Sequence, residues 1–294
     1  MDHKHLQNFL VLAETLHFGR ASERCFVSAP TLSRQIKQLE EEVGGALFYR
    51  DNRSVKLTAM GKAFVGYAKS TLSNWQHFKN ECLDESAPLT GKLHLFCSVT
   101  ATYSFVYELV SKFRAKHTEV ELHLTTGDPA QSITRVQEDK TDIAVAVKPA
   151  TLAENLSFQR LGRSPLRLIA PKVSCPVQQR LEEGAPVNEL AFIVSEQGVL
   201  KTRFEAWAKK RQFVPTVYAY VAGHEALVSL VSLGFGLAVV PEVVLEQSPF
   251  KEKVSILPVE DLGHIDIGLV AQKRRVNESI VSAFWSCSEE IFGS

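Results

Sequence analysis

A group of polar side chains between residues 28 and 38 has the types and the spacing that a nucleic-acid-reading helix needs. A helix over residues 29–43, turning 100° per residue, places on one apolar face Leu32, Ile36, Leu39 and Val43. Its opposite face, near the N-terminal end, carries Pro30, Thr31, Arg34, Lys37 and Gln38. Threonine and lysine contact phosphates, arginine pairs with guanine, and glutamine pairs with adenine. The pattern therefore predicts a helix that is buried on one side and contacts DNA with the other.

The two ends of this helix support the same interpretation. Ser28 is a good N-cap residue, Pro30 is tolerated in a first helical turn, and Gly44 begins a natural stop. The acids Glu40–Glu42 lie at the far end, where they stay away from phosphates if the N-terminal half enters the major groove. An ordinary amphipathic surface helix explains the apolar face, but it does not explain this separation.

Short elements must position the helix. Leu6 and Phe9 belong to an apolar stripe of a first helix, and a second helix is expected over about Arg20 to Cys25. A polar turn at Asp51–Ser54 predicts a small β-wing over residues 47–58. Positions 20–69 contain nine basic and five acidic residues, although the net charge of the whole chain is +0. This excess is compatible with a polyanionic partner, and also with plain solvated surface.

A long helix is expected over residues 59–85. Apolar and small residues recur at spacings of 4, 3, 4, 3 and 4 along it, which is typical of a coiled-coil seam: Phe64, Ala68, Thr71, Trp75, Phe78 and Cys82. A lone helix cannot bury such a seam, so the pattern predicts dimerisation, with core packing inside one domain as the alternative. Residues 86–91 then mark a boundary.

Residues 91–294 alternate strand-like and helical segments, which predicts an α/β domain with mostly parallel sheets. The expected strands are Leu93–Val99, Val120–Thr126, Ile143–Val147, Leu166–Ala170, Phe192–Val194 and Leu237–Val240. The expected helices include Ser104–Lys116, Leu200–Arg211 and Glu225–Leu233.

Several classes of protein are disfavoured. The sequence contains no run of about 18 or more apolar residues, so no membrane span is predicted. The N-terminus has no apolar signal region, so a cytoplasmic location is expected. Five scattered cysteines suggest reduced thiols and no metal site. We find no catalytic signature, so an enzyme is a minor alternative. A transport-type solute-binding protein is another, disfavoured by the missing export signal and the added N-terminal segment.

A family resemblance now becomes specific. The runs that carry it are His17–Ser22 and Val27–Glu40, followed by Gly44, Leu47–Arg50, Arg53, Leu57–Thr58 and Gly61. They resemble the all-α winged helix-turn-helix domain of LysR-type transcriptional regulators. Gly19 departs from the pattern, because the family usually has a capping Ser or Thr there.

The resemblance implies a domain plan and roles for residues. It implies a winged helix-turn-helix DNA-binding domain over 1–58, a linker and dimerisation helix over 59–88, and a two-lobed α/β effector domain, similar to periplasmic binding proteins, over 91–294. Arg34 would be the main base reader, with Ser28, Thr31, Ser33 and Lys37 positioning the helix. Arg50 and Arg53 in the wing would touch the DNA backbone or the minor groove.

In such two-lobed domains small ligands bind beyond the carboxyl ends of strands, near helix N-termini. Thr100, just after the first strand, matches the effector-contacting position of the family. Further candidates follow strands or begin helices: Ser98, Thr102, Gly127, Asp128, Ser195, Gln197, Gly223 and His224. For each Ser and Thr, a simple helix cap is an equal alternative.

Parts of the effector half resemble one branch of the family, the regulators of isoleucine–valine biosynthesis. The matching runs are Phe96–Ala101, Leu124–Asp128, Ile169–Pro171, Cys175–Val177, Gly223–Ser229 and Pro241–Glu246. The branch implies an autoregulated activator whose co-inducer is a 2-aceto-2-hydroxy acid, acetolactate or acetohydroxybutyrate. Lys148 could help the threonine hydroxyls to hold such an anion. The partners implied are a two-fold symmetric double-stranded operator, further copies of the chain as a homodimer or homotetramer, and RNA polymerase. Another pathway with a different small anion remains the alternative.

Overall fold

The computed structural model describes residues 2–50, 55–82 and 88–293. The chain separates into two compact units, Met1–Ala87 and Pro88–Ser294, which we call the N-terminal and the C-terminal unit. Among the described residues, no helix is both long enough and apolar enough to cross a membrane.

The N-terminal unit begins with three short helices whose ends follow from local chemistry. They are α1 (His3–Thr15), α2 (Phe18–Arg24) and α3 (Ala29–Val43). The Ser28 side chain caps α3 as predicted, and Gly44 ends it with a φ of 76°, a left-handed conformation that suits glycine. Helix α2 is capped by the His17 ring, which accepts a hydrogen bond from the Arg20 N–H. The missing hydroxyl at Gly19 therefore leaves no gap, because that position lies inside the helix.

The predicted wing is confirmed. Strands β1 (Phe48–Arg50) and β2 (Val55–Leu57) pair antiparallel, with Phe48 opposite Leu57. The apolar face of α3 is buried as expected, since Leu32, Ile36 and Leu39 have no exposed surface. They share one core with residues of α1 and the wing, among them Leu6, Phe9, Leu12 and Leu47.

Helix α4 (Ala59–Cys82) divides the predicted seam into two parts. Phe64 and Ala68 are buried inside the N-terminal unit, and the Phe64 ring lies edge-on to Phe9 with 4.9 Å between ring centroids. For these two residues the dimerisation prediction is wrong, because α1 already covers them. Trp75 and Phe78 are 44% and 53% exposed and stack on each other. The side chain of Cys82 lies outside the described residues.

The C-terminal unit is built on one mixed sheet with the strand order β10-β6-β11-β5-β3-β4. Its strands are β3 (Gly91–Cys97), β4 (Val120–Thr126), β5 (Ile143–Val147), β6 (Leu156–Pro171), β9 (Ala238–Pro241), β10 (Val254–Leu257) and β11 (His264–Gln272). Strand β3 is parallel to β4 and β5, whereas β11 is antiparallel to both β5 and β6. The expectation of mostly parallel sheets is thus wrong, because β6 and β11 run back and forth through the sheet.

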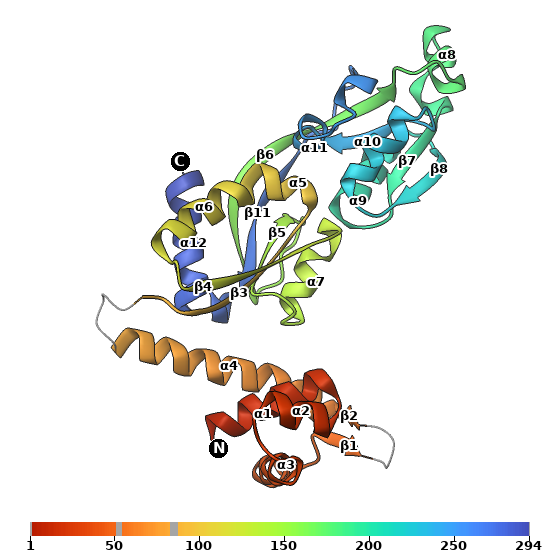
Figure 1. Cartoon of the computed structure of the whole chain (residues 1–294). Helices are drawn as coiled ribbons and strands as arrows, with labels where there is room; N and C mark the ends of the chain where they lie inside the picture. Colours follow the sequence, from red (N-terminus) through yellow and green to blue (C-terminus); the bar gives the residue numbers. More distant parts are fainter. Residues whose placement is uncertain (1, 51–54, 83–87, 294) are drawn as a thin grey trace. The chain divides into compact units, whose positions relative to one another are not determined.

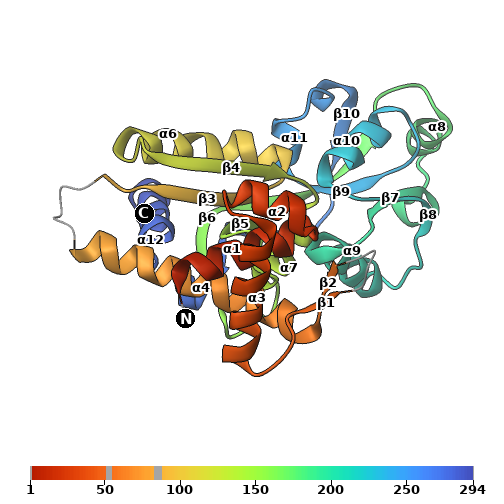
Figure 2. The ribbon, with the colours of Figure 1, turned by 60° about the horizontal axis from the view of Figure 1, so that its bottom comes forward.

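Strand β6 takes part in both lobes of this unit. Its residues from Leu156 to Pro165 pair with β11, and those from Leu166 onward pair with β9 and β10. In the second lobe, β7 (Ala191–Ser195) is parallel to β8 (Thr216–Val221). Figure 1 and Figure 2 show β6 extending from the region of β3, β5 and β11 toward that of β7 and β8.

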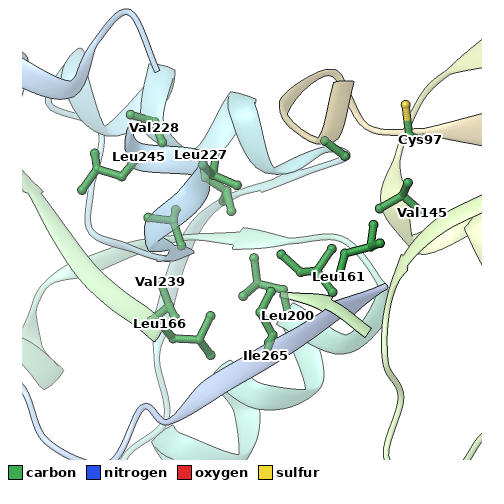
Figure 3. Close-up of a cluster of buried hydrophobic side chains, with 14 of the residues drawn as sticks. Cys97, Val145, Leu161, Leu166, Leu200, Leu227, Val228, Val239, Leu245 and Ile265 are labelled. Carbon is green, nitrogen blue, oxygen red and sulfur yellow. The ribbon is translucent and has the colours of Figure 1, made fainter. Parts of the chain in front are cut away.

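Helices cover the sheets of both lobes. The first lobe has α6 (Tyr107–Lys116), α7 (Ser132–Gln137) and α12 (Ser279–Phe292). The second lobe has α8 (Pro176–Glu182), α9 (Gly198–Lys210), α10 (His224–Ser232) and α11 (Glu242–Glu246). One hydrophobic core joins the lobes: Figure 3 labels Cys97 and Val145 of the first lobe together with Leu227 and Val239 of the second.

The first strand ends earlier than predicted. Strand β3 stops at Cys97, and the Ser98 hydroxyl accepts a hydrogen bond from the Ala101 N–H, which starts α5 (Val99–Ala101). A π-helical turn, Thr102–Val106, then leads into α6. Because the cap begins the helix at once, residues 99–103 extend the predicted helix 104–116 by more than one turn.

Candidate functional site

The polar face of α3 is open to solvent. Its predicted contact residues Ser28, Pro30, Arg34, Lys37 and Gln38 are exposed, and Thr31 and Ser33 are half-buried. Within the described part of the chain, the Arg34 guanidinium has neither an ion pair nor a hydrogen bond, so it is free to meet a partner. Ser28 and Thr31 share a hydroxyl–hydroxyl hydrogen bond of 2.7 Å.

Two other side chains of this face lean toward the acidic end of the helix. Lys37 Nζ lies 3.7 Å from Glu41 Oε1, and Gln38 Nε2 lies 3.3 Å from Glu42 Oε1. Both contacts join exposed side chains one turn apart, and such pairs contribute only a few tenths of a kcal/mol, about 0.3–0.5. A phosphate or a base edge can therefore displace them.

Arg50 of the wing is placed differently. Its Nη2 lies 2.6 Å from Glu40 Oε2, and its guanidinium lies over the Phe18 ring at 5.1 Å. Its charge is already partly neutralised, which leaves less of it for DNA than the sequence suggested. Arg53 lies outside the described residues.

In the C-terminal unit, the parallel strands β3, β4 and β5 bring their carboxyl ends to one edge of the sheet, as the sequence predicted. At this edge Thr100 is buried and donates two hydrogen bonds to a single oxygen of Glu225. The backbone N–H lies 2.8 Å and the hydroxyl 2.7 Å from Glu225 Oε1. Because Glu225 belongs to α10 of the second lobe, this contact joins the two lobes.

A second polar contact joins the lobes nearby. Gln197, just before α9, donates from Nε2 to Asp128 Oδ2 at 3.0 Å. Asp128 follows β4 and also accepts a hydrogen bond from the Ala130 N–H. The two candidates Asp128 and Gln197 are therefore neighbours.

His224 lies near both contacts, since it shares one cavity wall with Thr100 and another with Gln197. Its side chain is 8% exposed, and its ring nitrogens have no hydrogen-bond partner among the residues that the structure describes. Burial lowers the pKa of the His224 imidazole, and the charges of Glu225 and Asp128 oppose this only in part. At neutral pH His224 is thus a neutral ring that can accept or donate one hydrogen bond.

Three cavities surround these residues. The smallest, about 30 Å³, is lined by Ser98, Thr100 and His224 and is otherwise apolar. A larger one of about 550 Å³ lies between residues 129–150 of the first lobe and α9, and His224 and Gln197 border it. A third of about 450 Å³ opens on the other side of the Thr100–Glu225 contact. The smallest cavity holds little more than water, so an organic acid needs one of its walls to move.

Other sequence candidates are not brought to these cavities. Thr102 bonds to the Ser98 carbonyl and to the Cys97 sulfur, and the Ser195 hydroxyl bonds to the Gln197 carbonyl. The Lys148 ammonium lies over the Phe158 ring at 5.5 Å. None of the three cavities is lined by Thr102, Gly127, Asp128, Lys148, Ser195 or Gly223.

Sequence reasoning missed two residues of this region. Glu225 looked like an ordinary acid in the first turn of a helix, where the helix dipole stabilises a negative charge. Arg203 of α9 borders the 550 Å³ cavity and forms no ion pair within the described ranges. The only available signal was that both follow segments already suspected, Gly223–His224 and Ser195–Gln197.

Sequence comparison places this geometry in a family. Residues 3–62 match the bacterial regulatory helix-turn-helix proteins of the lysR family, and residues 86–292 match the LysR substrate binding domain. The chain belongs to the LysR family. The resemblance drawn from its motifs is thereby confirmed, and so is the fold of a winged helix-turn-helix joined to a two-lobed effector domain.

Several LysR-family relatives match over nearly the full chain. The transcriptional activator IlvY of Haemophilus influenzae is 41% identical over 293 residues, 98% of this chain and 100% of the relative. IlvY of Salmonella typhimurium is 43% identical over 291 residues, 97% of this chain and 98% of the relative. The relatives are transcriptional regulators, so this chain is a DNA-binding transcriptional regulator and not an enzyme.

Solved structures of the LysR family share the fold. A full-length OxyR variant from Pseudomonas aeruginosa superposes with a TM-score of 0.71 at 19% identity, covering 98% of this chain and 95% of that one. Full-length CbnR in complex with its target DNA superposes with a TM-score of 0.65 at 18% identity, covering 99% of this chain and 100% of that one.

Proposed function

We propose that this LysR-family regulator activates isoleucine–valine biosynthesis genes, and controls its own gene, in response to acetolactate or acetohydroxybutyrate. The observation that carries the proposal is the 41–43% identity to IlvY activators, which spans nearly all of both chains. The cleft chemistry agrees, because donors at Thr100 and the polar groups of Ser98 and His224 suit a small acid with hydroxyl and keto groups.

On the DNA side, α3 enters the major groove with its N-terminal half. Arg34, which is exposed and unpaired within the described part of the chain, reads a base edge, while the others align the helix on phosphates and neighbouring bases: Ser28, Pro30, Thr31, Ser33, Lys37 and Gln38. Arg53 contacts the backbone or the minor groove from the wing. Arg50 contributes less, because Glu40 holds it.

Assembly follows from the exposed half of α4. Trp75 and Phe78 form an apolar strip that a second copy can cover, and Thr71 beside them is half-buried. A dimer matches a two-fold symmetric operator, and pairs of dimers form a tetramer. Acting on chromosomal DNA in the cytoplasm, the activator contacts RNA polymerase.

The proposed target is the isomeroreductase gene of isoleucine–valine biosynthesis, and binding of the full-length protein to DNA upstream of this gene tests the proposal. Fluorescence anisotropy should give specific binding that an unrelated DNA of the same length does not compete. Acetolactate, but not valine, should change the footprint or the affinity, and calorimetry should register acetolactate binding. Specific DNA binding without any response to either acetohydroxy acid would assign the chain to another pathway, and absence of specific binding to this DNA would remove the proposed target.

A further inference from the structure

The Glu225 carboxylate is held without a cation partner among the described residues, as is that of Asp128, which accepts hydrogen bonds from Gln197 and the Ala130 N–H. Glu242 and Asp142 of the same unit pair instead with Arg167 and Arg275. Glu225 is half-buried as well, yet within the described ranges no cation pairs with it, and its only hydrogen-bond donor is Thr100. Because hydrogen bonds alone hold it there, another carboxylate can replace Glu225 without breaking an ion pair.

The donors at Thr100 form a carboxylate-binding position that is already filled. A backbone N–H and a hydroxyl converge on one oxygen within 2.8 Å, which is the geometry of charge-assisted hydrogen bonds. A second observation points to a ligand at the same place. His224 is more than nine-tenths buried, borders the same small cavity as Thr100, and its ring has no partner among the described residues.

We propose that the Glu225 carboxylate is a built-in competitor that occupies the subsite for the effector's carboxylate at Thr100, so that effector binding requires an exchange of one carboxylate for the other. This inference rests on the proposed function for the identity of the effector, but the competition itself does not depend on that identity. The exchange conserves charge at the subsite, because one anion replaces another. The hydroxyl or keto group of the effector then reaches Ser98 or the His224 ring.

The exchange has room to proceed. Glu225 borders the 450 Å³ cavity, whose walls include Ser229, Gln247 and Ser248, so the displaced side chain can move there and remain solvated. Thr100 borders both this cavity and the 30 Å³ cavity, so a group that replaces Glu225 at Thr100 stands next to both. Since Glu225 and Thr100 belong to different lobes, the exchange also breaks a direct link between the lobes. Glu225 is therefore a positioning residue that sets the effector concentration at which the lobes respond.

Two measurements on the full-length protein test this inference. Glu225→Ala frees the subsite, and Glu225→Gln keeps the shape while removing the charge. In calorimetry, acetolactate should bind Glu225→Ala about ten- to a hundredfold more tightly than the wild type, with Glu225→Gln between them. Glu290→Gln is the matched control: Glu290 pairs with Lys112 and Lys116, lines none of the three cavities, and should leave affinity unchanged.

The second measurement needs no ligand. Hydrogen exchange at the Thr100 amide should be slow in the wild type and at least tenfold faster in Glu225→Ala, while amides of the neighbouring strand β4 keep their rates. Unchanged exchange at Thr100, or weaker acetolactate binding by Glu225→Ala, would overturn the competition. If no variant binds acetolactate, the proposed effector is wrong, and the Thr100 amide still decides whether Glu225 occupies the subsite.

Discussion

Glu40 holds Arg50 at 2.6 Å through one carboxylate oxygen, and through the other it accepts the backbone N–H groups of Leu47 and Phe48. The last turn of α3 is thereby fastened to the first strand of the wing. The acids at this end are thus unequal: the side chain of Glu40 is 15% exposed and structural, whereas that of Glu41 is 68% exposed and pairs with Lys37.

Replacement of Glu40 should therefore loosen the wing. We expect Glu40→Ala to lower the free energy of unfolding by about 2–3 kcal/mol, since two buried N–H groups and one guanidinium lose their acceptor. Urea denaturation followed by circular dichroism measures the change. Glu41→Gln, a substitution on the neighbouring exposed acid, should stay within about 0.5 kcal/mol. Equal effects of the two substitutions would argue against a structural role of Glu40.

Arg34 should determine operator specificity. Arg34→Ala is expected to cost about 1–3 kcal/mol on the cognate operator and little on unrelated DNA, because a base contact is lost. Lys37→Ala should weaken binding to the operator and to unrelated DNA alike, and it should reduce the slope of log affinity against log salt concentration by about 1. Anisotropy titrations at several salt concentrations separate the two patterns. A uniform loss for Arg34→Ala would make it a phosphate contact instead.

The two halves of α4 should respond differently to substitution. Phe64→Ala removes a buried ring that packs on Phe9, so the N-terminal unit should lose about 3–5 kcal/mol of stability. Trp75→Ala should shift the chain from dimer toward monomer in sedimentation at micromolar concentration, with a smaller loss of stability than Phe64→Ala. A stable dimer of Trp75→Ala together with Phe78→Ala would place the interface elsewhere.

His224 should make folding sensitive to mild acid. Its pKa is lowered in the folded chain by burial, so the unfolded chain binds a proton more readily. The stability from this group is therefore complete above the ordinary pKa of about 6.5 and decreases as the pH falls below it. The melting temperature between pH 7.5 and 5 should fall less steeply in His224→Gln than in the wild type. His117, whose pKa burial also lowers, contributes with the same sign, so His117→Gln should remove a separate share.

The DNA-binding half was largely predictable because its signals are local. Ser28 caps α3, Gly44 ends it, and the buried stripe has helical spacing, so about fifteen consecutive residues determine the element. The burial of Phe64 was not predictable in this way, because a seam with coiled-coil spacing looks the same whether α1 or a second copy covers it.

The effector half was harder to predict for the opposite reason. Strands β10 and β11 and the first part of β6 escaped prediction, since the residues they pair with lie between 83 and 128 positions away in the sequence. The Thr100–Glu225 contact joins residues 125 positions apart, and nothing about a threonine or a glutamate at these positions predicts it. The candidate residues that follow β3 and β4 could be named from the sequence, because parallel pairing brings the carboxyl ends of these strands to one edge of the sheet.

The sixteen residues of β6 have a consequence for how the effector half can be divided. A fragment that ended near Pro165 would leave the second lobe without the strand to which β9 and β10 pair, and one that began there would leave β11 with an open edge. Each fragment would lack a strand that its sheet needs for pairing, so neither lobe should fold when it is expressed alone. A protease cut within β6 should likewise unfold both lobes.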